Sequence, residues 1–152
     1  MTTQYTYPNG DTYLGPSLKN LDTNSNQKSG PLGKYTLNNN KATYIGNFNN
    51  DQFHGSGIII FNNGDVFEGN FQNNKIHGRG KYFWADGISF VEGDYQDNEL
   101  IGNGIYKGEE QCWEGSFYQN MGAVGLRCQL VEREWRKSIK DAFGSDFSSF
   151  FK

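Results

Sequence analysis

Hydrophobic and polar residues alternate along several short stretches of this chain. In residues 44–48, YIGNF, and again in residues 67–71, FEGNF, aromatic residues and glycine occupy every second position. The positions between them hold mainly polar side chains. Because successive side chains of a β-strand point to opposite faces, this period of two predicts a strand in each stretch. One face of these strands should carry aromatic rings, and the other should be mostly polar.

The strand pattern belongs to a unit that repeats at about 23 residues. Units begin at Tyr44, Phe67, Phe90 and Trp113. Their common frame is aromatic-x-Gly-x-aromatic, then a polar turn, then Gly-x-Gly, although the third unit has one extra residue and the last unit is shortened. Residues 7–15 form an earlier partial copy, so the array begins near the N-terminus.

Each unit is predicted to form one β-hairpin. Residues 62–65, Asn-Asn-Gly-Asp, and 85–87, Ala-Asp-Gly, tolerate the positive φ that tight connections between antiparallel strands require. One hairpin is marginally stable in water, whereas stacked hairpins bury a shared face. The sequence therefore predicts an all-β fold, an elongated single-layered antiparallel sheet. A ring from a neighbouring strand is expected to lie across the central glycine of each aromatic-x-Gly-x-aromatic strand.

The chain divides into three predicted regions. Residues 1–43 hold degenerate repeat units interrupted by a polar loop at 16–31, residues 44–122 form the array, and residues 123–152 form a C-terminal extension. Val91 inserts one residue into the third unit, which predicts a bulge and altered curvature towards the C-terminal end.

The C-terminal extension predicts an amphipathic helix over residues 130–143. Trp135, Ile139 and Phe143 recur at helical spacing, and Gly144 follows them as a helix stop. This helix could cover the last hairpin as a terminal cap, or it could dock into another protein. Both roles stay open at this point.

The frame YIGNF…HGSG…NGDVFEGNF…HGRG…ADG resembles the MORN (membrane occupation and recognition nexus) repeat. The resemblance covers about residues 5–122 and is sharpest at 44–95, with a departure at Ile101, which replaces the histidine. It implies an extended single-layered sheet, concave on one side, that acts as a non-catalytic scaffold. Proteins of this family occur in ciliary and cytoskeletal assemblies, at membrane contact sites, and attached to lipid kinases or methyltransferases.

Composition and charge narrow the classes of function. No apolar run approaches the ~18 residues needed to cross a bilayer, and the first residues lack the blocks of a signal peptide, so we expect a cytoplasmic protein. Residues 44–117 carry eleven acidic and four basic side chains, a net charge of −7. Such a charge disfavours a nucleic-acid or anionic-lipid partner, because either would require a basic stripe.

The candidates for chemistry have structural explanations. His54 and His77 recur in frame, but no cysteine or carboxylate recurs beside them to complete a metal site. The Gly-x-Gly steps precede strand-like runs rather than helices, so they are not phosphate-binding loops. Glu68, Glu92 and Glu114 occupy equivalent places on the polar face, as solvated residues do. We therefore predict no catalytic, cofactor-binding or metal-binding residues, and no enzyme activity.

The remaining candidate site is formed by the aromatic residues of the repeats. A single-layered sheet cannot bury both faces, and Tyr and Trp are frequent anchors of binding surfaces. We call the predicted surface the aromatic face; its residues are Tyr44, Phe48, Phe61, Phe67, Phe71, Tyr82, Trp84, Tyr95, Tyr106, Trp113 and Phe117. Trp135, Phe150 and Phe151 of the extension are predicted to bind a partner as well.

These observations predict a scaffold that binds a peptide or helix of another protein through the aromatic face, within a multi-subunit assembly. Its acidic surroundings would select a basic or neutral partner. The resemblance adds a cytoskeletal or ciliary setting, such as the axoneme. A homodimer stays open, and the alternative function is that of a peripheral membrane adaptor recognising anionic phospholipids.

Overall fold

The computed structural model describes residues 2–109, 112–118 and 121–122 of the 152-residue chain. All regular secondary structure within these residues is β. The twelve strands are β1 (Thr2–Thr6), β2 (Thr12–Lys19), β3 (Asn26–Lys28), β4 (Gly30–Thr36), β5 (Ala42–Asn49), β6 (Gln52–Phe61), β7 (Val66–Gln72), β8 (Lys75–Phe83), β9 (Phe90–Gln96), β10 (Glu99–Lys107), β11 (Cys112–Tyr118) and β12 (Met121–Gly122).

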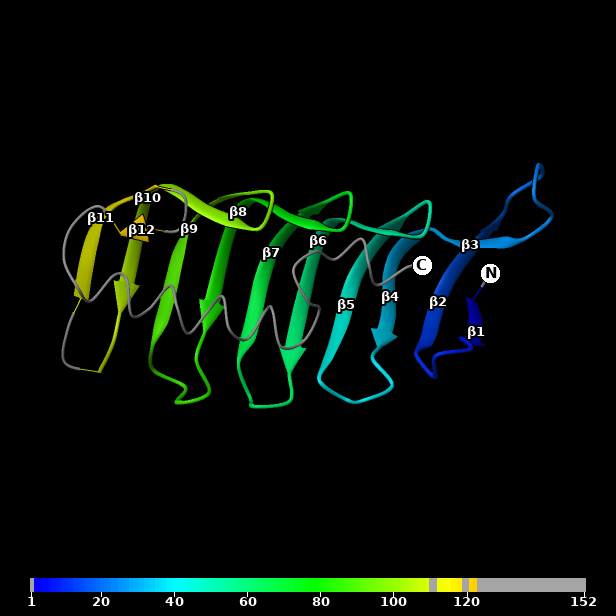
Figure 1. The fold of residues 1–152 in the computed structure, drawn as a ribbon, viewed down its shortest axis with the longest axis horizontal. Coiled ribbons are helices and arrows are strands. Elements are labelled where there is room, and N and C mark those ends of the chain that lie inside the picture. Colours follow the sequence, from blue (N-terminus) through cyan, green and yellow to red (C-terminus); the bar gives the residue numbers. More distant parts are fainter. Residues whose placement is uncertain (1, 110–111, 119–120, 123–152) are drawn as a thin grey trace.

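The strands stand side by side in the order in which they occur along the chain. Each pairs antiparallel with the next, from β1 through β2 and β4 to β12, while β3 pairs with β2 away from this path. Figure 1 shows one open layer with β1 near one end and β11 near the other. The single-layered, all-β antiparallel sheet is thus confirmed, with no helix among the described residues. The predicted C-terminal helix falls within residues 123–152, which lie outside the described residues.

Each regular hairpin turns on two residues in the left-handed conformation. Asn73 and Asn74 have φ of 50° and 67°, and the pairs at 50–51 and 97–98 have similar values. Positive φ at both central residues gives a two-residue turn whose twist matches that of antiparallel strands. Asn and Asp tolerate this conformation because their short side chains bond locally. These polar pairs therefore set where each hairpin reverses.

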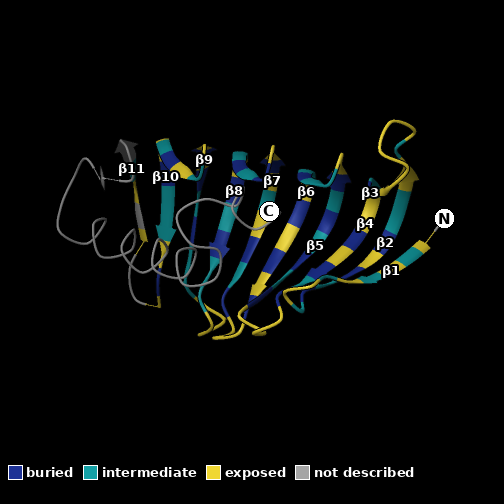
Figure 2. Cartoon of the chain, turned by 45° about the vertical axis from the view of Figure 1, so that its right-hand side comes forward, coloured by how far each residue is buried: buried dark blue, intermediate teal, exposed yellow. Residues whose placement is uncertain are grey.

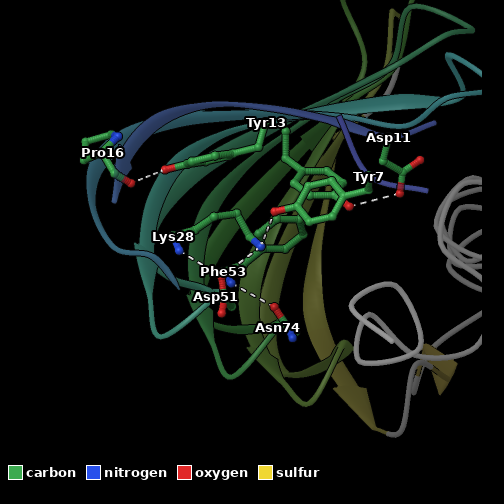
Figure 3. Close-up of polar contacts among 9 residues, drawn as sticks. Tyr7, Asp11, Tyr13, Pro16, Lys28, Asp51, Phe53 and Asn74 are labelled. Atoms are coloured by element: carbon green, nitrogen blue, oxygen red, sulfur yellow. Dashed lines mark hydrogen bonds and ion pairs between the residues drawn. The ribbon is translucent and has the colours of Figure 1, made fainter. Parts of the chain in front are cut away.

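The second turn residue also ties each hairpin to the preceding one. Asn74 Oδ1 accepts a hydrogen bond from the Phe53 backbone N–H at 2.8 Å, and the Asn74 N–H donates to the Phe53 carbonyl at 3.1 Å (Figure 3). Asn98 makes the same two bonds to Ile76. Because these bonds join neighbouring units, they fix the register of the array.

Buried aspartates join the connections at the opposite ends of the strands. The Asp65 carboxylate accepts hydrogen bonds from the Ala85 backbone N–H at 2.8 Å and from the Tyr82 hydroxyl. Asp11 accepts an equivalent bond from the Tyr35 hydroxyl at 3.0 Å. Both aspartates follow an Asn-Gly pair, so the Asn-Gly-Asp sequence marks a turn that also bonds the next unit.

A row of glycines crosses the sheet at right angles to the strands. Its members stand in register on neighbouring strands: Gly33, Gly46, Gly57, Gly69, Gly80, Gly93, Gly104 and Gly115. A Cβ at Gly57 would lie 2.5 Å from Cε2 of Tyr44, and a Cβ at Gly80 would lie 2.5 Å from Cζ of Phe67. Rings from the neighbouring strand therefore lie across the second glycine of the Gly-x-Gly steps. At the central glycines Gly46 and Gly69 the nearest ring atoms belong to Tyr44 and Phe67 of the same strand, contrary to the prediction.

The extra residue of the third unit lengthens a turn. Val91 is buried and occupies in β9 the position that Phe67 occupies in β7. The connection from Trp84 to Ser89 is one residue longer than the equivalent 61–65 connection. The β9–β10 pair does contain a register shift, but β5–β6 and β7–β8 shift at the same place. The insertion is therefore not the cause of this shift, contrary to our expectation.

The polar stretch 16–31 also differs from the predicted loop. Strand β2 continues to Lys19 and pairs with β3, while β4 begins at Gly30. Only residues 20–25 and Ser29 lie outside strands in this stretch. The chain returns to the array here because Lys28, the last residue of β3, is buried against it.

Candidate functional site

The residues of the predicted aromatic face gather on one side of the sheet, which we call the inner face. Seven of them are at most 4% exposed: Tyr44, Phe48, Phe61, Phe67, Phe71, Tyr82 and Tyr95. Figure 2 shows these buried positions alternating with more exposed ones along the strands. Trp84 and Tyr106 are partly buried and pack against this core. Most of the aromatic face is thus the hydrophobic core of the sheet.

The remaining predicted residues are placed only in part. Trp113 and Phe117 belong to β11, where Trp113 stands in register with Tyr106. Trp135, Phe150 and Phe151 lie outside the described residues. Their binding roles remain predictions.

The rings hold the units together by direct contact. Tyr44 stacks on Phe53 with ring centroids 3.8 Å apart, and it meets Phe48 and Phe71 edge-on at 5.2 and 5.1 Å. These partners come from three strands, so one ring bridges two units. Offset-stacked and edge-on pairs contribute about 0.5–1.5 kcal/mol each beyond the area they bury.

Several core residues were absent from the predicted face. Phe53, Ile76 and Leu100 are buried at the starts of β6, β8 and β10. Each stands two residues before a glycine of the Gly-x-Gly step, so the repeat frame itself contained the signal. These side chains fill the inner face near the two-residue turns.

Burial fixes the protonation of the inner-face tyrosines. The Tyr44 hydroxyl donates to the Asn47 carbonyl at 2.7 Å, and the Tyr13 hydroxyl donates to the Pro16 carbonyl at 2.6 Å. Desolvation raises the pKa of Tyr13 to about 12 and raises the pKa of Tyr44 as well. These hydroxyls therefore act as hydrogen-bond donors at neutral pH, not as acid–base groups.

Trp84 and Tyr106 are only partly buried on the inner face, as are Tyr5 and Tyr7 towards its other end. Their rings meet edge-on with centroids 6.0 Å apart, and Trp84 meets Tyr82 in the same way at 5.2 Å. The indole Nε1 of Trp84 is buried, and no acceptor lies within reach among the described residues. A buried donor without an acceptor costs about 1–3 kcal/mol. This end of the face therefore holds both aromatic surface and an unused donor.

The N-terminal end of the inner face closes in a polar cluster around Lys28 (Figure 3). Lys28 is 3% exposed, and its Nζ lies 3.0 Å from Asp51 Oδ1 and 2.8 Å from the Tyr7 hydroxyl. It also lies over the rings of Tyr7 at 5.0 Å and Tyr35 at 5.6 Å from their centroids. Burial lowers the pKa of Lys28, and the neighbouring Asp51 carboxylate opposes that shift.

Lys28 occupies a recognisable position of the repeat. The Lys28 backbone N–H donates a hydrogen bond to Asp51 Oδ1 at 2.8 Å. In the later units the Phe53 N–H donates in the same way to Asn74 Oδ1, and the Ile76 N–H donates to Asn98 Oδ1. Lys28 thus fills the position of an apolar residue, and Asp51 fills that of an asparagine. Aligning Lys28-Ser29-Gly30 with Phe53-His54-Gly55 would have found this equivalence in the sequence.

The two histidines lie on the opposite side of the sheet, the outer face. His54 and His77 each precede a glycine with positive φ, 76° at Gly55 and 87° at Gly78. The backbone there requires the glycine, whereas the preceding position also accepts Ile101 in the third unit. Within the part of the chain that the structure describes, no group of three or more His, Cys, Asp or Glu side chains could hold a metal ion.

The outer face combines charge with apolar surface. Glu68 and Glu92 stand in register with Lys81, and Arg79 pairs with Glu92 at 2.9 Å and with Asp94 at 3.7 Å. The carboxylates of Glu92 and Asp94 are therefore partly neutralised by Arg79. The same face also exposes isoleucine side chains, so it is less polar than the alternation predicts.

A repeated two-strand unit, a glycine row across the sheet and one buried aromatic side define this chain as a single-layered β-hairpin repeat protein. The family model of the MORN repeat matches residues 44–66 and 67–89, the two units in which the sequence pattern is sharpest. The chain therefore contains two MORN repeats, at residues 44–66 and 67–89. A comparison with curated proteins found no match. No helix within the described residues is long and apolar enough to span a bilayer.

Proposed function

We propose that this protein is a non-catalytic scaffold that binds a peptide or helix of another protein through its aromatic face within a larger assembly. MORN repeats are repeat scaffolds that often serve protein or membrane interactions, which supports this class of function. The observation that carries the proposal is the partly buried aromatic surface at Trp84 and Tyr106. Tyr and Trp anchors of this kind dominate many protein interfaces.

Burial supports a division of the aromatic face into core residues and residues that could contact the partner. Tyr44, Phe67 and Tyr82 are inaccessible and hold the sheet together. We therefore propose contact at Trp84 and Tyr106, and the repeat pattern of the sequence adds Trp113 and Phe117 of β11 to this proposal.

The test compares the full chain with two variants in a purification from its native source. Trp84→Ala should lose the stoichiometric partners that copurify with the wild type. Leu18→Ala, which removes a side chain that is 63% exposed in β2, is the matched control and should keep them. A wild-type protein that purifies alone and monomeric, or partners that survive Trp84→Ala, would contradict the proposal.

The competing function is that of a peripheral membrane adaptor recognising anionic phospholipids. Family members that act at membranes favour it, whereas the net charge of −7 over residues 44–117 opposes it. Pelleting of the full chain with phosphatidylserine vesicles at low and high salt separates the two functions. Strong, salt-sensitive binding would replace the scaffold proposal with the adaptor.

We also propose a cytoplasmic location in a cytoskeletal or ciliary assembly, which rests on the family resemblance alone. Fluorescence imaging of the tagged full chain in its native cells tests it. A signal spread evenly through the cytoplasm, with no enrichment on filaments or cilia, would remove that part of the proposal.

A further inference from the structure

The outer face carries a second continuous apolar surface. Four residues from four consecutive strands stand in register there: Ile60, Val66, Phe83 and Phe90. Ile58 and Ile45, which pair across β6 and β5, stand on the neighbouring line of the same face and border Ile60, two residues further along β6. We call these six residues the outer apolar row. The members are far apart in sequence, and only the strand register brings them together.

The outer apolar row is open to solvent. Ile58 is 37% exposed and Ile60 is 43% exposed, while the other members are half-buried. The rings of Phe83 and Phe90 lie side by side with centroids 6.1 Å apart. The solvated face of an antiparallel sheet is ordinarily polar, and a contiguous apolar patch marks an interaction surface.

The direction of the row selects the shape of its occupant. It crosses five strands, β5 to β9, which are spaced about 4.8 Å apart, so it is roughly 19 Å long, with a sideways step of about 7 Å between Ile60 and Ile58 on β6. A strand binds at a sheet edge through backbone bonds and not across a face. A helix presents one apolar residue per turn of about 5.4 Å, which is close to the strand spacing. A helix of about 13 residues would span the row.

The charges beside the row select the chemistry of the occupant. Glu68, Lys81 and Glu92 form the neighbouring line on the outer face, in register with Ile58. Lys81 Nζ lies 3.8 Å from Glu92 and 3.9 Å from the centroid of the Phe90 ring, so its charge is already engaged. The long flank of the row therefore presents acidic groups.

The ends of the row limit the occupant further. Lys34 stands in register with Ile45 at one end, and Lys107 stands in register with Phe90 at the other. Basic groups of a partner would thus fit along the flank and not beyond the ends. A second copy of this chain would bring two acidic arrays together, since residues 44–117 carry a net charge of −7.

We propose that the outer apolar row docks one amphipathic helix of a partner protein. The apolar stripe of this helix, about 13 residues long, covers the row, and its Lys or Arg side chains lie beside Glu68 and Glu92. The surface lies on the opposite side of the sheet from Trp84 and Tyr106. The proposal therefore stands or fails independently of the function proposed for the aromatic face.

The test uses the purified full chain and labelled synthetic peptides of about 14 residues, with binding followed by fluorescence anisotropy. The first peptide carries a leucine stripe at helical spacing and lysines along one flank. In the second peptide glutamates replace the lysines, and the third has the composition of the first in scrambled order. We expect the lysine peptide to bind at least about tenfold more tightly than either of the others.

Variants of the protein locate the binding surface. The double variant Ile60→Thr/Val66→Thr keeps β-branched residues in the strands. It should lower the affinity for the lysine peptide about tenfold. Leu18→Thr removes a more exposed apolar side chain far from the row and should leave binding of the lysine peptide unchanged. Glu68→Lys should lower the affinity for the lysine peptide and raise the affinity for the glutamate peptide. Loss of folding cannot produce this reversal.

Four results would overturn the proposal. The first is equal binding of the scrambled peptide, and the second is unchanged binding by the Ile60→Thr/Val66→Thr protein. The third is a concentration-dependent dimer that this double variant abolishes, which would assign the row to a second copy. The fourth is row-dependent binding to phosphatidylserine vesicles, which would assign it to a membrane.

Discussion

At the scale of the residue, Lys28 shows how a repeat position accepts a change of chemistry. It replaces the apolar residue of later units, and Asp51 replaces the asparagine that bonds to it. The carboxylate, the Tyr7 hydroxyl and the neighbouring rings compensate in part for the desolvation of the ammonium group. The two substitutions therefore depend on each other.

This dependence predicts the result of a double-mutant cycle. Asp51→Asn alone should lower the free energy of unfolding by about 2 kcal/mol, because Lys28 would lose its counter-ion. The figure stays below the ~3–5 kcal/mol of a fully buried pair because the Asp51 side chain is 38% exposed. Adding Lys28→Met should recover most of the loss, since an apolar side chain and an asparagine are what the next unit holds. Urea unfolding measures all four proteins, and additive losses would refute the coupling.

At the scale of the element, the glycine row makes each strand depend on its neighbour. A ring seated over a glycine of the next strand leaves no room for a side chain there. Gly57 illustrates the point because its φ is not positive, so any cost of substitution there is steric. Gly87 is the opposite case, with a φ of 73° and no atom within 4 Å of the place that an added methyl group would take.

The two glycines therefore make a matched pair. Gly57→Ala should destabilise by about 2–3 kcal/mol, because the new methyl group would press on the Tyr44 ring. Gly87→Ala should lower the free energy of unfolding by only about 1 kcal/mol, because the only cost is that alanine disfavours the positive φ at this position. Thermal and urea unfolding give both values. Equal losses would show that the rings move aside freely.

The elements themselves followed from local sequence. Alternation at 44–48 and 67–71 fixed the strands, and the recurring Gly-x-Gly frame fixed the hairpins, because both signals are carried by residues close together in the chain. The side of the sheet on which Tyr44 and Phe67 lie was also predictable, since it depends only on the period of two.

Features that depend on cross-strand register were not predictable in the same way. Ile60, Val66, Phe83 and Phe90 come from four strands, so their alignment requires the pairing of every hairpin to be known. The extent of ring burial also depends on contacts between units. The aromatic face could therefore be located from the sequence, but its division into a closed core and an open end at Trp84 could not.

At the scale of the whole molecule, the buried tyrosines couple stability to pH. Burial raises the pKa of Tyr7 and Tyr13 from an ordinary 10.0 to about 12. A group whose pKa is higher in the folded protein contributes stability that is complete below pH 10 and is lost as pH rises through about 12. The array should therefore lose stability between these two values, and the loss should coincide with tyrosinate absorbance.

Tyr13→Phe provides the control for this alkaline transition. It removes one titrating group and the hydrogen bond to the Pro16 carbonyl, so the variant should be less stable at neutral pH and lose less between pH 10 and 12. Unfolding free energies measured across this range test both effects. Ionisation of all tyrosines near pH 10 without loss of structure would contradict the assignment.

Because the strands of the sheet follow one another in chain order, the length of the sheet is proportional to the number of repeats. Each two-strand unit lengthens the sheet by roughly 9.6 Å. Because adjacent strands are rotated by about 20–25° relative to each other, each unit also rotates the sheet about its long axis. Adding or removing a unit would thus change both the separation and the relative angle of whatever is attached at the two ends, in fixed steps.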